Sequence, residues 1–188
     1  LQFGEQSSIA PDSGLVGALK MAAAGFALVV MCYQGFAMSH SSAIAIWNSA
    51  IIPMASLLYS LAMGVAGAMI LLPSAQSAGL ADTQMLLLLG LAVMHLMLIH
   101  GGWHGNPGAR TSVELLLQSI YAKWFWGLVV SAGILLPALL LWFAPASGTV
   151  AFISAFAMLS GFFTWRVLIF KIGVYEPIMS MNPFQSAR

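Results

Sequence analysis

Met21–Ala81 reads MAAAGFALVVMCYQGFAMSHSSAIAIWNSAIIPMASLLYSLAMGVAGAMILLPSAQSAGLA, 61 residues without one Asp, Glu, Lys or Arg. A second uncharged stretch covers Trp124–Trp165. Charged residues make up 6% of the chain, whereas a soluble domain has about 25%. A water-soluble domain could not leave so much surface without charge, so the chain is predicted to lie in a lipid bilayer.

Five apolar stretches are long enough to cross about 30 Å of hydrocarbon, which takes about 20 helical residues. Turn-forming Pro, Gly, Asn and Ser residues separate most of them. We therefore predict an all-α, polytopic transmembrane helix bundle with two short interfacial segments, at 39–50 and 109–123. The predicted spans are 15–38, 51–73, 83–102, 124–145 and 148–172, between a polar lead-in at 1–14 and an extramembrane tail at 173–188. The chain begins with Leu1, and we expect it to be the remainder of a longer one.

One face of the predicted bundle is basic. The first, third and fifth spans run in the same direction, so their last turns share one face with 39–50, 104–123 and the tail. The basic residues on that face are Arg110, Lys123, Lys171 and Arg188, against Lys20 near the other. The positive-inside rule makes the basic face cytoplasmic. A docking partner could equally require these charges.

Three polar side chains are predicted at similar depth near that face. Tyr33, followed by Gln34, precedes the end of the first span by about one turn, and His95 and Arg166 lie inside the third and fifth spans. An Arg at this depth costs a few kcal/mol unless it is paired or reaches the headgroups. Two interpretations stay open for the three side chains. In the first, they form a polar pocket. In the second, Tyr33 is an interfacial ring, His95 makes a hydrogen bond to a neighbouring helix, and Arg166 reaches the headgroups.

These residue types suit a quinone, whose two carbonyl groups accept hydrogen bonds and gain protons on reduction. A haem needs axial His ligands, normally from facing helices; His95 has no counterpart inside a second span, so no haem is expected. Cys32 is the single cysteine, and no metal site is expected. No span contains Asp or Glu, which weakens a proton-pump or cation-transporter function. A formal charge of +1 excludes a nucleic-acid surface.

Several short motifs follow one another in a familiar order. They are Tyr33-Gln34-Gly35-Phe36, Ile46-Trp47-Asn48-Ser49, Ile52-Pro53, Trp124-Phe125-Trp126-Gly127, Leu135-Leu136-Pro137 and Gly161 through Arg166. From about Leu15 onward, the chain resembles the NrfD/polysulfide-reductase family of integral membrane subunits. Two departures from the family pattern stand out: His95 replaces a Glu of many members, and Phe162 replaces the second glycine of a Gly-Gly pair.

The resemblance implies an eight-helix subunit without a redox cofactor of its own, in the prokaryotic inner membrane. Such a subunit exchanges electrons between the quinone pool (menaquinone or ubiquinone, an exchangeable substrate) and a docked, ferredoxin-like iron–sulfur subunit. That partner would in turn serve a molybdopterin enzyme or a cytochrome. The resemblance also implies that Tyr33 contacts the quinone head group and that Arg166 is the buried cation of the last helix. The family's first three helices have no counterpart here, so we expect the C-terminal part of such a subunit.

We therefore expect a non-catalytic or quinone-reactive membrane subunit of a quinone-linked oxidoreductase. The residues expected to bind quinone or handle its protons are Tyr33, Gln34, His95 and Arg166. Those expected to dock the partner are Trp47, Asn48, Arg110, Lys123 and Lys171. Two alternatives stay open: a portion of a non-redox transporter, and a purely structural membrane anchor.

Overall fold

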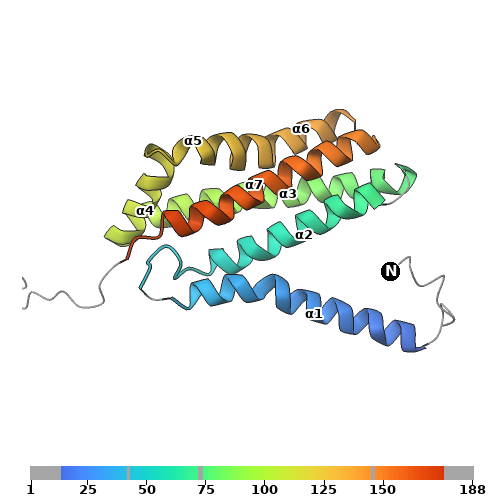
Figure 1. Cartoon of the computed structure of the whole chain (residues 1–188), viewed down its shortest axis with the longest axis horizontal. Helices are drawn as coiled ribbons and strands as arrows, with labels where there is room; N and C mark the ends of the chain where they lie inside the picture. Colours follow the sequence, from blue (N-terminus) through green and yellow to red (C-terminus); the bar gives the residue numbers. More distant parts are fainter. Residues whose placement is uncertain (1–13, 42, 72–73, 145–146, 176–188) are drawn as a thin grey trace, which may run out of the picture.

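The computed structural model describes residues 14–41, 43–71, 74–144 and 147–175 (Figure 1). Most of the predicted lead-in and tail, including Arg188, lies outside these residues, as does the side chain of Gln34. Five helices in the described part are long and apolar enough to cross a membrane. The predicted all-α transmembrane bundle is therefore confirmed.

The helices follow one another with short connections. In chain order they are α1 (Gly14–Ser39), α2 (Ile51–Leu71), α3 (Ser74–Trp103), α4 (Pro107–Gln118), α5 (Ala122–Trp124), η2 (Phe125–Leu135), α6 (Leu136–Phe143) and α7 (Gly148–Lys171). The fourth span consists of α5, η2 and α6 without a break. The third helix begins before its apolar run, because helical hydrogen bonding continues into polar residues beyond the part that can face lipid.

The short helix α4 lies at the end of the bundle where α3 ends (Figure 1). Asn106 caps it, since the Asn106 Oδ1 atom accepts a hydrogen bond from the Ala109 amide at 3.0 Å. Pro107 occupies a first-turn position, where the helix needs no N–H group. The buried residues of α4, among them Val113 and Leu116, turn towards the bundle.

The fourth span contains an eleven-residue π-helix, η2, which ends two residues before Pro137. Proline has no N–H group and cannot continue an ordinary helical ladder, and wider π-helical turns are one way to accommodate such a break. The π-helix packs on α7 through two buried glycines. A Cβ atom added to Gly133 would lie 2.9 Å from the Gly161 Cα atom, so this close approach of the two backbones requires glycine.

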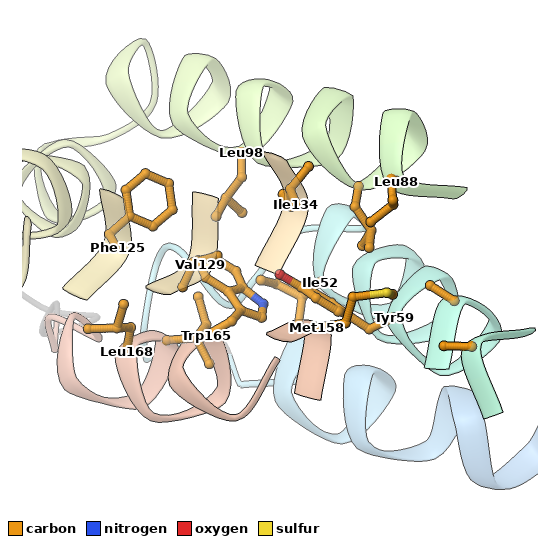
Figure 2. Packing of buried hydrophobic residues seen from close by; sticks show 14 of the residues in the cluster. Ile52, Tyr59, Leu88, Leu98, Phe125, Val129, Ile134, Met158, Trp165 and Leu168 are labelled. Carbon is orange, nitrogen blue, oxygen red and sulfur yellow. The ribbon is translucent and has the colours of Figure 1, made fainter. Parts of the chain in front are cut away.

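The apolar core lies between α2, α3, η2 and α7 (Figure 2). Val129 from η2, Met158 and Trp165 from α7, and Leu98 from α3 meet there. The helix α1 lies beside α2 and contributes Met38, near its C-terminal end, to this core. Towards its own N-terminus it diverges from α2 (Figure 1). Most of its side chains are exposed, as expected for a helix in lipid.

Candidate functional site

The helices α1 and α2 cross closely near the C-terminal end of α1. Gly35 is buried there, and a Cβ atom at this position would overlap the backbone of Pro53. One turn away, the Ser56 hydroxyl group donates a hydrogen bond to the Met31 carbonyl oxygen at 3.0 Å. A glycine contact and an interhelical hydrogen bond therefore hold the last turns of α1 on α2.

Arg166 enters this crossing from α7. Its Nη2 atom donates a hydrogen bond to Ser56 Oγ at 3.1 Å, and its guanidinium group lies over the Phe162 ring, 4.9 Å from the ring centroid. Arg166 is half-buried and does not extend freely towards the headgroups. The two bonds of Ser56 join α7, α2 and α1 at one point.

His95 is 5% exposed and makes two hydrogen bonds. Its Nδ1 atom lies 2.7 Å from the Leu91 carbonyl oxygen, which can only accept, so Nδ1 carries the ring proton. The Nε2 atom of the neutral ring therefore accepts the hydrogen bond from the Tyr59 hydroxyl group at 3.2 Å. The helix-to-helix hydrogen bond considered for His95 exists, and its partner, Tyr59, is not among the residues predicted from the sequence.

Aromatic contacts connect the two hydrogen-bonded pairs. The Phe162 ring, which lies under Arg166, is 5.0 Å from the Tyr59 ring, and the Trp165 ring is 4.6 Å from the His95 ring. Ser56 and Tyr59 are three residues apart on α2, which places them on the same side of the helix. We call Ser56, Tyr59, His95 and Arg166 the internal polar cluster. Of the residues expected to bind quinone, the structure brings His95 and Arg166 together here.

Tyr33 lies outside the internal polar cluster. Its position is two residues before Gly35, about 200° around the helix, so it faces away from α2. The side chain is 72% exposed. It lines an open hollow of about 490 Å³ with Phe36, Ala37, Ser39 and His40. The internal polar cluster, in contrast, leaves only about 10 Å³ beside Arg166, in a space that Met38 also lines.

The residues expected to dock a partner gather at one end of the bundle, where α3 and α7 end (Figure 1). Arg110 forms an ion pair with Glu114 at 3.0 Å. Lys123 lies over the Trp124 ring, 5.8 Å from its centroid. Lys171 is an exposed residue in the last turn of α7. Basic side chains are therefore present on the surface at this end.

Trp47 and Asn48 differ in their surroundings. Trp47 Nε1 donates a hydrogen bond to the Ile169 carbonyl oxygen at 2.9 Å, and its ring contacts Phe170 edge-on at 5.4 Å. This side chain is therefore used inside the chain, where it ties the loop before α2 to the end of α7. Asn48 is exposed and lines a hollow of about 280 Å³ together with Ser49, Gly101 and Asn106.

Comparison with known proteins gives one match. The family described as polysulphide reductase, NrfD, matches residues 8–176. No curated protein and no solved structure matches the chain. Among the described residues, no group of three or more His, Cys, Asp or Glu side chains could hold a metal ion. Because the family match covers nearly the whole chain, the chain belongs to the NrfD polysulphide reductase family, whose members are membrane subunits of quinone-linked oxidoreductases.

Proposed function

We propose that this chain exchanges electrons between the membrane quinone pool and a docked iron–sulfur subunit, with the quinone head group bound against Tyr33. The observation that carries the proposal is the open hollow at Tyr33. The hollow is shallow and is lined by residues at the end of α1 alone, so the 72% exposed Tyr33 side chain is presented to a molecule in the bilayer. A quinone diffuses within the hydrocarbon, so it can enter such a hollow sideways from the bilayer.

The hollow offers suitable chemistry for a quinone ring. The Tyr33 hydroxyl group can donate a hydrogen bond to a quinone carbonyl oxygen, and Phe36 gives an apolar surface for the ring. His40, at the edge of the hollow, lies just beyond the end of α1 and is exposed. Reduction of the quinone takes up two electrons and two protons to give the quinol, and oxidation of the quinol releases them.

In this proposal Arg166 and His95 do not contact the quinone, because the space beside them is too small for a ring. They act through the helices that carry the site. Arg166 fixes the Ser56 hydroxyl group, which holds the Met31 carbonyl oxygen of α1. Met31 precedes Tyr33 by two residues, so this connection sets the position of the turn that carries Tyr33. In this role Arg166 and Ser56 are positioning residues, and His95 supports α2 through its hydrogen bond with Tyr59. None of the three touches the quinone.

The basic end of the bundle is the proposed docking surface for the iron–sulfur subunit. Lys123 and Lys171 supply positive charge there, beside the Arg110–Glu114 ion pair, and this charge suits an acidic partner. Tyr33 lies within about two turns of the same end of α1, so the electron path from the partner to the quinone is short. A molybdopterin or cytochrome subunit would complete the complex in a prokaryotic inner membrane.

The variant Tyr33→Phe tests the proposal in the assembled complex. It removes one hydrogen-bond donor and leaves the ring. We therefore expect kcat/KM for quinol oxidation or quinone reduction to fall about threefold to tenfold. Co-purification of the partner subunits should not change. Tyr175→Phe is the matched control, since Tyr175 is also exposed (67%) but lies beyond the end of α7.

Three other results would contradict the proposal. Unchanged quinone kinetics in Tyr33→Phe would show that the quinone head group does not bind in this hollow. Unchanged electron transfer together with poor assembly would favour a structural anchor. Altered solute flux through proteoliposomes without any quinone activity would favour a transporter.

A further inference from the structure

A histidine pair at the end of α3 has no role in the proposed quinone site. His100 lies in the last turn of α3 and His104 follows the helix directly, and both are exposed. Their ring centroids are 4.4 Å apart, with an angle of 42° between the ring planes. A spacing of four residues places two side chains on the same side of a helical turn, so the two imidazoles face the same solvent region.

The hydrogen bonding of His104 leaves one of its ring nitrogens free. Its Nδ1 atom lies 3.0 Å from the His100 carbonyl oxygen. Because a carbonyl oxygen can only accept, Nδ1 carries the proton, and Nε2 of the neutral ring keeps its lone pair. Histidines that bind metals usually have this arrangement, in which a backbone carbonyl holds one nitrogen and fixes the direction of the other.

The charged side chains of α4 near the histidine pair are engaged with each other. The nearby Arg110 guanidinium group is paired with Glu114 and lies over the Trp103 ring, 5.4 Å from its centroid. Glu114, the carboxylate of α4, is therefore bound to an arginine.

We propose that His100 and His104 form an open binding site for one divalent transition-metal ion. Imidazole nitrogens favour Zn²⁺, Ni²⁺ and Cu²⁺, with Cu²⁺ bound most tightly, and two histidines spaced i, i+4 on a helix are a known ligand pair for zinc. With no group of three ligands among the described residues, water completes the coordination shell. The site is therefore exchangeable, unlike a closed structural site. It does not depend on the proposed quinone site.

Cu²⁺ titration of the complex, purified through a tag without histidine, tests this site. Electron paramagnetic resonance should show one Cu²⁺ ion with nitrogen ligands, and Zn²⁺ should displace it. His100→Gln and His104→Gln should each weaken Cu²⁺ binding by about tenfold or more, because loss of a ligand costs at least as much as loss of the groups that orient it. Both residues are exposed, so the variants should fold.

His40→Gln provides the matched control, because His40 is another exposed histidine at the same end of the bundle. It should leave the affinity for Cu²⁺ unchanged. Equal binding in all variants, or an equal loss in His40→Gln, would overturn the assignment. Binding of Cu²⁺ without nitrogen hyperfine structure would do the same.

Discussion

Arg166 donates a hydrogen bond from Nη2 to Ser56 Oγ over 3.1 Å and thereby joins the last span to the second. The same hydroxyl group donates to the Met31 carbonyl oxygen of the first span. One small side chain thus connects three helices. A charge held in this way inside a membrane is tolerated because the guanidinium group has a polar acceptor and an aromatic face beside it.

Ser56→Ala is expected to loosen this connection. It removes both hydrogen bonds and leaves a half-buried guanidinium group without its acceptor, so the free energy of unfolding should fall by about 1–2 kcal/mol. Reversible unfolding in mixed detergent micelles measures the change. Ser60→Ala is the control, because the Ser60 hydroxyl group donates a hydrogen bond within its own helix, to the Ser56 carbonyl oxygen at 2.9 Å. Equal effects of the two variants would show that the link between the helices contributes nothing.

Gly35→Ala is expected to separate α1 from α2. The added methyl group would overlap the Pro53 backbone, and backbone atoms cannot move aside as the end of a side chain can. Overpacking of this kind costs about 1–3 kcal/mol. A cysteine pair introduced across the two helices should cross-link more slowly in Gly35→Ala membranes. Gly25→Ala, where nothing lies within 4 Å of the new atom, should cross-link at the rate of the wild type.

The five spans could be predicted because lipid leaves the backbone little choice. Long uncharged runs such as Met21–Ala81 must satisfy every N–H and C=O group internally, and a helix does so within one segment. The π-helix before Pro137 could not be predicted in this way. Its turns bring Gly133 against Gly161, and this contact with another helix has no signal in the pattern of a single span.

The sequence predicts the membrane depth of the candidate site residues but not the helix face on which Tyr33 lies. Met31, two residues before Tyr33, is tied through Ser56 to Arg166, so Tyr33 and Arg166 lie at similar levels. However, α1 is apolar on all sides, and no amphipathic stripe indicates which face meets its neighbour. The sequence therefore predicts Tyr33 beside His95 and Arg166, whereas in the structure Tyr33 faces away from them. Tyr59 was missed although its position, three residues after Ser56 in an apolar span, was a usable signal.

Trp47→Phe should weaken the attachment of the loop before α2 to the end of α7. The indole N–H group bonds to the Ile169 carbonyl oxygen at 2.9 Å, in the last turn of a helix, where carbonyl groups lack helical partners. Loss of this donor should cost about 1 kcal/mol of unfolding free energy and increase amide exchange at 44–49. Trp142→Phe is the control, since Trp142 is 74% exposed. No difference in exchange at the loop would contradict the prediction.

Tyr59 and His95 depend on each other, because removal of either side chain leaves the other without its hydrogen-bond partner. Tyr59→Phe deletes the donor to His95 Nε2 at a position that is 3% exposed, and it should cost about 1 kcal/mol of unfolding free energy. His95→Leu should cost more, since the ring also bonds to Leu91 and packs on Trp165. In the double variant the two costs should not add, and the difference should be about 0.5–1.5 kcal/mol. Additive costs would mean that the hydrogen bond contributes nothing, and the two side chains would then be held in place by the aromatic packing around them.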